Sequence, residues 1–252
     1  MALEAGVTPE PVAGGRGLAD VLAGAAYRLQ TRVGGTPSLA LPLARARGRG
    51  EVIGDDTDIV IESFPRCASS FAVAAFRLAQ EPRAMRIANH THVPAQILVA
   101  ARRGVPALVL TRPPEAAVLS HVIHTPSLTI SRSLRGYVRF YEPLLRVRGA
   151  FVVGSFDEVV RDFGSVIERI NERFDTSFGR FEHSEANLAR LRGEIERDYR
   201  SRARTDDELE RTIPRPSALR EGLKERLREQ YRRAPAELRS RADAAFDRLS
   251  PG

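Results

Sequence analysis

The stretch that indicates the fold is Asp58-Ile59-Val60-Ile61-Glu62-Ser63-Phe64-Pro65-Arg66-Cys67-Ala68-Ser69-Ser70-Phe71. Residues 59–64 form a short, apolar and β-branched run, which is typical of a strand buried in a sheet. The run stops at Pro65, and a helical pattern starts near Ser69 and continues to Leu78. A strand, a tight loop and a helix in this order form the arrangement that binds phosphate in α/β folds.

Similar units follow along the chain. Further buried strands are predicted at 106–111 and 150–154, with a short strand just before Asn89. Helices are predicted at 18–32, 69–78, 94–103, 114–123, 134–147 and 156–174. Strands that alternate with helices imply a parallel sheet with helices on both faces. We therefore predict a three-layer α/β fold with a central, mostly parallel sheet flanked by helices.

The last quarter of the chain has a different pattern, in which strands are not predicted. Highly charged helices are expected at 185–204, 217–233 and 235–249, with a break at Pro214 and Pro216. These helices could pack over the sheet, form a lid or make an oligomer contact, so a homo-oligomer is left open.

The domain organisation follows from these patterns. Residues 1–16 are rich in Gly, Pro and Ala and are expected to be flexible. Residues 36–58, rich in Pro, Gly and Arg, are expected to be a connector. We predict a single α/β domain over 17–252, with its core at 58–178 and a helical C-terminal part at 184–250.

Composition excludes several classes of protein. The 252 residues are 42% hydrophobic, which is ordinary for a globular chain, and they contain no apolar run long enough for a membrane span. The N-terminus lacks the features of a secretory signal, so a cytoplasmic location is expected. Cys67 is the single cysteine, which excludes an internal disulfide and a zinc site built from several cysteines.

The net charge of +7 and the pI near 10.4 raise the question of nucleic-acid binding. Nearly all of the basic charge is arginine, since Lys224 is the only lysine, and the arginines are interleaved with carboxylates. That pattern is typical of solvated helix faces with i,i+4 ion pairs, so we predict no nucleic-acid partner.

The loop at 65–71 carries the first candidate site. Ser69 and Ser70 stand at the start of a helix, where unpaired N–H groups and the helix dipole attract an anion, and Arg66 adds a guanidinium that can fork onto phosphate or sulfate. A plain helix cap at Ser69 explains the same residues equally well. The loop lacks the glycines and the lysine of a Walker A motif, which argues against ordinary ATP or GTP hydrolysis.

The segment Asn89-His90-Thr91-His92-Val93-Pro94 carries the second candidate site. An imidazole has a suitable ordinary pKa, about 6.5, to accept a proton from a substrate hydroxyl. Two histidines at i,i+2 could instead bind a metal, but a third ligand of suitable spacing is missing, so no metal is predicted. A purely structural pair that caps the next helix is a further alternative.

The third candidate site joins Arg112, at the end of a predicted strand, with Ser120, eight positions later on the following helix. Ligands of open α/β folds bind in the crevice at the carboxyl edge of the sheet, where such an arginine would point. A surface ion pair for Arg112 and a small packing residue at Ser120 are the alternatives.

In combination, these features resemble the sulfotransferase family that uses 3′-phosphoadenosine 5′-phosphosulfate (PAPS). The family loop has the form P-[KR]-S-G-[ST]-[ST]-[WF], is followed by T-H-[LV]-P, and then by R-[ND]-P with a serine eight residues after the arginine. This chain has Pro65 to Phe71, Thr91-His92-Val93-Pro94, and Arg112-Pro113-Pro114 with Ser120. Phe156-Asp157-Glu158-Val159 is similar to a later Y-E-D-L element. The resemblance covers roughly residues 58–178.

The resemblance implies a reaction and a role for each residue. The chain would transfer a sulfuryl group from PAPS, its co-substrate, to a hydroxyl of a small-molecule or carbohydrate acceptor without a metal ion. His92 would be the general base, and Arg66 would stabilise charge on the bridging oxygen. The phosphosulfate would be held by the loop residues Arg66, Cys67, Ala68, Ser69, Ser70 and Phe71. Arg112 and Ser120 would bind the 3′-phosphate.

Two alternatives follow from departures from the family pattern. Cys67 and Ala68 stand where the family has serine and glycine, so the chain could be a catalytically degenerate member that binds a nucleotide. A nucleotide-dependent, kinase-like enzyme is the other alternative. The family's C-terminal R-K-G element has no clear counterpart, and Arg215, Arg220 and Lys224 are the candidates to replace it.

Overall fold

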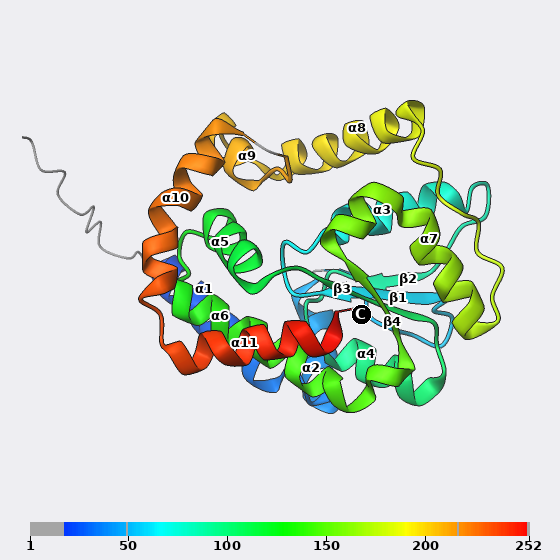
Figure 1. The fold of residues 1–252 in the computed structure, drawn as a ribbon, viewed down its shortest axis with the longest axis horizontal. Helices are drawn as coiled ribbons and strands as arrows, with labels where there is room; N and C mark the ends of the chain where they lie inside the picture. Colours follow the sequence, from blue (N-terminus) through cyan, green and yellow to red (C-terminus); the bar gives the residue numbers. More distant parts are fainter. Residues whose placement is uncertain (1–17, 49, 216, 251–252) are drawn as a thin grey trace, which may run out of the picture.

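The computed structural model describes residues 18–48, 50–215 and 217–250. Its centre is a sheet of four parallel strands in the order β2-β1-β3-β4 (Figure 1). The strands are β1 (Ile59–Ser63), β2 (Ile87–Asn89), β3 (Ala107–Thr111) and β4 (Val152–Ser155). Every predicted strand is present, and the parallel pairing confirms the predicted α/β fold. The flexibility predicted for residues 1–16 concerns a segment outside the described residues.

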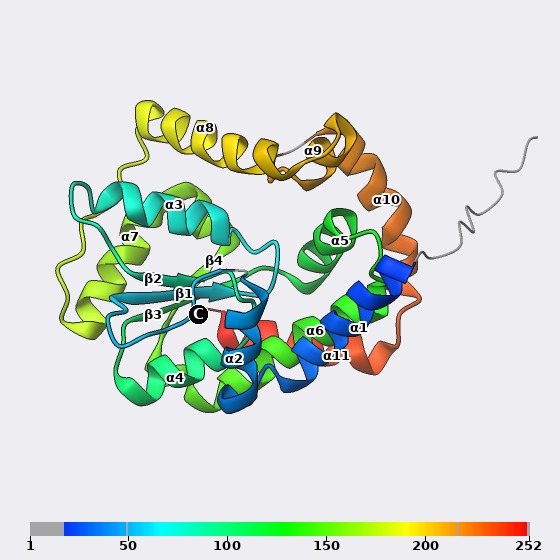
Figure 2. The same cartoon turned by 180° about the vertical axis from the view of Figure 1, so that it is seen from behind.

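Helices cover both faces of the sheet and make a three-layer structure (Figures 1 and 2). On one face lie α3 (Ser69–Ala79) and α7 (Phe156–Phe174), which pack on β1 and on β3 and β4 respectively. On the other face α4 (Ala95–Arg103) packs on β1 and β3. Because both faces are covered, β1 and β3 are buried along their whole length, which explains the largely apolar runs from which they were predicted.

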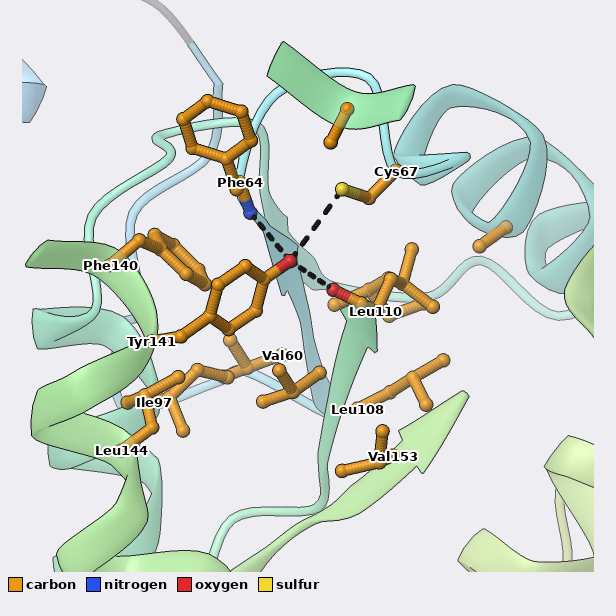
Figure 3. Close-up of a cluster of buried hydrophobic side chains, with 14 of the residues drawn as sticks. Val60, Phe64, Cys67, Ile97, Leu108, Leu110, Phe140, Tyr141, Leu144 and Val153 are labelled. Atoms are coloured by element: carbon orange, nitrogen blue, oxygen red, sulfur yellow. Dashed lines mark hydrogen bonds between the residues drawn. The ribbon is translucent and has the colours of Figure 1, made fainter. Parts of the chain in front are cut away.

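Tyr141 connects the carboxyl ends of two neighbouring strands from within the core (Figure 3). Its hydroxyl donates to the Leu110 carbonyl at 2.6 Å and accepts from the Phe64 amide at 3.4 Å. The ring is completely buried, and burial raises the pKa of the Tyr141 phenol well above its ordinary value. This contact anchors the segment that leads from β1 into the loop.

The interpretation of residues 36–58 as a connector is wrong over its first half, because α2 (Pro37–Arg47) is a helix. Pro37 occupies the first turn, where a proline is tolerated because its missing N–H would have no partner. Ala40, Leu41 and Ala44 are buried on the side of α2 that packs on α4. Burial of this apolar face favours the helix despite Pro42 in its interior.

The helix predicted at 134–147 begins earlier and ends earlier than expected. α6 (Ile130–Tyr141) starts after Thr129, whose hydroxyl caps the Arg132 amide. Residues Glu142–Ala150 continue as a 3₁₀ segment, since Pro143 has no N–H to extend the α-helical hydrogen bonds. α1 (Leu18–Val33) and α5 (Pro114–His124) agree with their predictions.

The C-terminal helices pack mainly on other helices. α8 (Glu185–Arg202) lies over α3, α10 (Ala218–Arg232) packs on α5, and α11 (Ala236–Leu249) packs on α6 (Figure 1). A short helix that the sequence analysis did not predict, α9 (Asp206–Thr212), connects α8 to α10. None of the described helices is both long and apolar enough to cross a membrane.

Candidate functional site

The loop between β1 and α3 turns sharply through two residues in the left-handed conformation. Arg66 has a φ of 71° and Ala68 a φ of 69°. Glycine adopts this conformation at the lowest cost, so Ala68 carries strain where the family pattern has glycine. Ala68 is also the N-cap of α3 and offers no side-chain hydrogen bond to the helix. The first amides of α3 are therefore left for an anion rather than for a cap.

Cys67 faces away from this turn. Its side chain is fully buried, and its sulfur lies 3.5 Å from the Tyr141 hydroxyl oxygen (Figure 3). Burial raises the pKa of the Cys67 thiol to about 11, so the group is a neutral thiol at physiological pH. Cys67 thus places a core-forming side chain where the sulfotransferase pattern has serine. Any contact of residue 67 with a ligand in the turn would come from its backbone.

The guanidinium groups of three arginines gather around the loop and Ser120. Arg66 Nε donates to Ser120 Oγ at 3.3 Å, and Arg220 Nη2 donates to the same oxygen at 3.0 Å. Arg112 Nη1 donates to the carbonyl of Arg66 at 3.0 Å. The Arg112 guanidinium also lies 4.0 Å from the centre of the Phe156 ring. The structure therefore brings the two parts of the predicted donor site, loop and strand end, together.

None of these three guanidinium groups has a carboxylate partner at ion-pair distance within the described ranges. Arg220 is 4% exposed, and burial, followed by the nearby Arg66 and Arg112, lowers its pKa to about 10. Burial likewise lowers the pKa of Arg112. Buried like charges are costly unless a counter-charge is supplied. An anion with several oxygens is the group that such a cluster can stabilise.

The structure distinguishes among the three C-terminal candidates. Arg215 is half-exposed and pairs with Glu210 at 2.9 Å, and Lys224 pairs with Glu221 at 2.6 Å. Arg220, in contrast, reaches Ser120 from α10. From the sequence, Arg220 is only one of three candidates, because its position relative to Ser120 depends on how α10 packs on α5.

His92 stands on the other side of the loop, with its side chain 25% exposed. Its Nδ1 lies 2.8 Å from the Ser63 carbonyl. A carbonyl oxygen can only accept, so Nδ1 carries the hydrogen and Nε2 is the basic nitrogen of the neutral ring. This tautomer is the one required of a general base that acts through Nε2.

Glu62 holds the backbone around His92 in place. Its buried carboxylate accepts from Thr91 N at 2.8 Å, Thr91 Oγ1 at 2.7 Å, His92 N at 3.1 Å and Gln96 Nε2 at 2.9 Å. The carboxylate also lies 4.0 Å from His92 Nδ1. The sequence analysis missed this role, although a glutamate inside an apolar strand run was a visible signal.

His90 is a less suitable base than His92. Its Nδ1 contacts the Asn89 side-chain oxygen and its Nε2 lies 3.4 Å from Ser70 Oγ. Burial, followed by the neighbouring His92, Arg202 and Arg77, lowers the pKa of His90 to about 3. The ring is therefore neutral near pH 7 and too weakly basic to hold a substrate proton. In the part of the chain that the structure describes, no group of three or more His, Cys, Asp or Glu side chains is placed to hold a metal.

A cavity of about 1330 Å³ adjoins the loop and the two histidines. The loop contributes Pro65 and Ser70, and His90 and His92 form part of its wall. Arg112, Ser120 and Arg220 lie outside it. The arginine cluster and the cavity therefore flank the loop as separate compartments that meet at Arg66 and Ser70.

Tyr199 of α8 covers the junction of the two compartments. Its hydroxyl lies 3.3 Å from Arg66 Nη1 and 3.4 Å from Ser70 Oγ. The sequence contained no signal for this contact, which bridges more than a hundred residues of chain. The other loop side chains are less central, since Ser69 is buried and Phe71 packs on Phe181 and His183.

Comparison with known proteins finds a likeness to a solved structure at low sequence identity. No family model matches the sequence, and no curated protein matches it. Among solved structures, the crystal structure of mouse sulfotransferase SULT7A1 complexed with PAP is similar, with a TM-score of 0.41 and 12% sequence identity. The match covers 77% of this chain and 89% of that chain. At this level of likeness, the function has to be argued from the residues of the chain itself.

Proposed function

We propose that this chain is a PAPS-dependent sulfotransferase that transfers a sulfuryl group to an acceptor hydroxyl. The observation that carries the proposal is the cluster of Arg66, Arg112 and Arg220 around Ser120, which has no carboxylate at ion-pair distance within the described residues. The cluster borders the loop that leads into α3, whose first backbone amides have no side-chain cap. On the other side of the loop lies the cavity, where His92 holds its hydrogen on Nδ1 and leaves Nε2 free to accept a proton.

Each compartment would take one end of the reaction. Arg112, Arg220 and Ser120 would hold the 3′-phosphate of PAPS, while the amides of Ser69 and Ser70 at the start of α3 would hold the 5′-phosphosulfate. The acceptor would enter the cavity and present a hydroxyl to His92. The sulfuryl group would then lie between the two compartments, beside Arg66 and Ser70.

The chemistry requires positioning and charge neutralisation more than covalent assistance. As the acceptor oxygen bonds to sulfur, the bond from sulfur to the bridging oxygen of the phosphosulfate breaks. His92 Nε2 accepts the hydroxyl proton, and the Glu62 carboxylate stabilises the imidazolium that forms. Arg66 neutralises the negative charge that develops on the bridging oxygen. That oxygen stays on the 5′-phosphate, and 3′,5′-ADP is the leaving group.

The first test is thermal stabilisation by 3′,5′-ADP compared with ATP. A ligand that binds only the native state at a hundred times its Kd adds about 2.7 kcal/mol of stability, which corresponds to a rise in Tm of about 5 °C or more for a chain of this size. ATP, which lacks the 3′-phosphate, is expected to give a smaller shift. A protein that responds equally to both ligands, or to neither, would contradict the proposal.

The second test separates an enzyme from a nucleotide-binding protein without activity. His92→Ala is expected to lower the rate of sulfate transfer by about 100-fold or more while the response to 3′,5′-ADP is retained. His90→Asn is the matched control and is expected to lose far less activity, because a ring with a pKa of about 3 is not the base. An unchanged rate for His92→Ala would remove this residue from the mechanism.

A further inference from the structure

Five arginines lie along the contact between α1 and α6, on the surface beside the cavity. The two helices run side by side (Figure 2), and Arg139 Nη1 of α6 donates to Thr31 Oγ1 of α1 at 3.3 Å. The five form a shallow groove together with Tyr27 and Thr31, and we call them the arginine seam: Arg28, Arg32, Arg132, Arg135 and Arg139.

The seam gathers five positive charges on one surface. None of its five guanidinium groups pairs with a carboxylate of residues 24–48, 50–215 and 217–250. The sequence of α6, Ile130–Tyr141, contains no aspartate or glutamate at all. On α8 and α10, in contrast, arginines are matched by carboxylates three or four positions away, such as Arg200 with Glu196 and Arg232 with Glu229. The charge of the seam is thus distinct from the mixed pattern elsewhere.

The geometry suits an extended anion. Arg132 and Arg139 are separated by two helical turns, which corresponds to about 10 Å along the helix axis. Four of the five arginines are exposed and Arg132 is half-buried. Like charges at this spacing repel one another when the seam is empty, so a ligand with several sulfate, phosphate or carboxylate groups would relieve the repulsion.

The seam and the cavity share part of their walls. Tyr27 and Thr31 line both. The Tyr27 hydroxyl is buried between them and has no hydrogen-bond partner among the described residues. A buried hydroxyl without a partner is costly unless a ligand supplies one. A molecule bound along the seam can therefore continue past Tyr27 towards His92.

We infer that the arginine seam binds the anionic part of an extended acceptor, whose hydroxyl enters the cavity at His92. The inference rests on the proposed function and narrows its acceptor to an anionic carbohydrate. The seam lacks the exposed aromatic side chains on which nucleic-acid bases stack, since the Tyr27 ring packs against His121 with ring centres 5.6 Å apart. The cavity exceeds the usual size for a drug-like ligand, which suits an extended substrate.

The experiment compares two triple variants of equal charge. The seam variant carries Arg28→Gln, Arg32→Gln and Arg135→Gln, and the control carries Arg102→Gln, Arg146→Gln and Arg161→Gln, which are exposed arginines on other elements. Binding of a fluorescent heparin hexasaccharide is measured against salt concentration. We expect the seam variant to bind about tenfold more weakly with a reduced salt dependence, and the control to stay within about twofold of the original chain.

Three results would overturn the inference. The first is an equal loss of hexasaccharide affinity in both variants, and the second is no salt-dependent hexasaccharide binding by the original chain. The third is that a DNA duplex of equal charge binds to the seam more tightly than the hexasaccharide. Stabilisation by 3′,5′-ADP is measured on the same three proteins and should be the same in all. A response to 3′,5′-ADP without a seam effect overturns only the inference about the acceptor. A seam effect without that response overturns the proposed function, and the acceptor role of the seam with it.

Discussion

The two sides of the loop at residues 65–68 differ in how their charged side chains are compensated by neighbouring groups. On the side proposed to bind the sulfuryl donor, which we call the donor side, Arg66, Arg112 and Arg220 gather without a carboxylate at ion-pair distance in the described chain. On the side proposed to bind the acceptor, the acceptor side, the buried carboxylate of Glu62 accepts hydrogen bonds from the segment that carries His92. Buried charge normally requires such compensation.

The difference indicates which part of the site is complete before substrate arrives. The acceptor side is already ordered, because Glu62 organises the turn that carries His92. The donor side has a surplus of positive charge that an anionic ligand would balance. We therefore expect substitutions on the donor side to change ligand affinity, and substitutions on the acceptor side to change stability and turnover.

The largest effect is expected from Arg220→Ala on the donor side. A hydrogen bond to a charged group contributes about 1.5–3 kcal/mol, so loss of this guanidinium should raise the Kd for 3′,5′-ADP by about 10- to 100-fold. Arg215→Ala is the matched control, since Arg215 is half-exposed and paired with Glu210, and its Kd should change by about twofold at most. Titration calorimetry measures both. Equal losses would mean that Arg220 has no special place in the donor site.

On the acceptor side, Glu62→Gln tests the compensation at the buried carboxylate. The amide –NH₂ of glutamine would face donors at Thr91, His92 and Gln96, so we expect a loss of about 1–3 kcal/mol in the free energy of unfolding. As a positioning residue, Glu62 should also affect the rate: kcat should fall about tenfold with little change in KM.

The split between kcat and KM distinguishes positioning from general destabilisation in Glu62→Gln. A positioning role lowers kcat of the folded protein, whereas general destabilisation lowers only the amount of folded protein. Glu115→Gln, at an exposed pair with Arg228, is the control and should leave both constants unchanged. A Glu62→Gln kcat per folded molecule identical to that of the original chain would restrict Glu62 to a structural role.

The two sides should also respond differently to acid. Burial lowers the pKa of His90 from 6.5 to about 3, and lowers the pKa of His121 well below 6.5. Between pH 6.5 and these lowered pKa values, the unfolded chain binds more protons than the folded chain. The free energy of unfolding is therefore highest above about pH 6.5 and decreases as the pH falls. We expect a loss of about 1 kcal/mol per histidine between pH 7.5 and 5.5, measured by denaturant unfolding.

His90→Asn should remove about half of this loss, because it deletes one of the two groups that protonate on unfolding. The guanidinium groups of the donor side stay charged over this range, so 3′,5′-ADP binding to the folded protein should change little. A pH-independent stability would show that His90 and His121 are accessible to protons in the folded chain.

The smallest effect is expected where the two sides meet. Tyr199→Phe removes the hydroxyl that contacts Arg66 and Ser70 at 3.3–3.4 Å but keeps the ring beside His124. Because that hydroxyl competes with the donor for the same groups, its loss should tighten 3′,5′-ADP binding by about two- to threefold. Tyr231→Phe, on α10, is the control and should leave the affinity for 3′,5′-ADP unchanged. A weaker affinity would instead mean that the Tyr199 hydroxyl contacts the ligand.

Local hydrophobic patterns in the sequence predicted the strands of the sheet. They failed where tertiary packing overrides the local secondary-structure propensity of a segment. β1 and β3 were recognisable because burial on both faces requires continuous apolar runs. α2 was missed because its prolines and the glycines that follow it suggested a connector, whereas the burial of Ala40, Leu41 and Ala44 against α4 stabilises a helix. α6 began earlier than predicted because the cap at Thr129 was not recognised.

The sequence by itself determined the strand, the loop and the helix at 58–79, because a buried run, a proline stop and a helix start act over a few residues. It also determined which residue types could bind an anion there. Only the tertiary structure decided that Arg220 meets Ser120 a hundred positions away, that Tyr199 covers Arg66, and that Arg28 and Arg32 line up with the arginines of α6. Such contacts depend on which helix faces pack together, and that choice minimises exposed apolar surface over the whole chain rather than in any local segment.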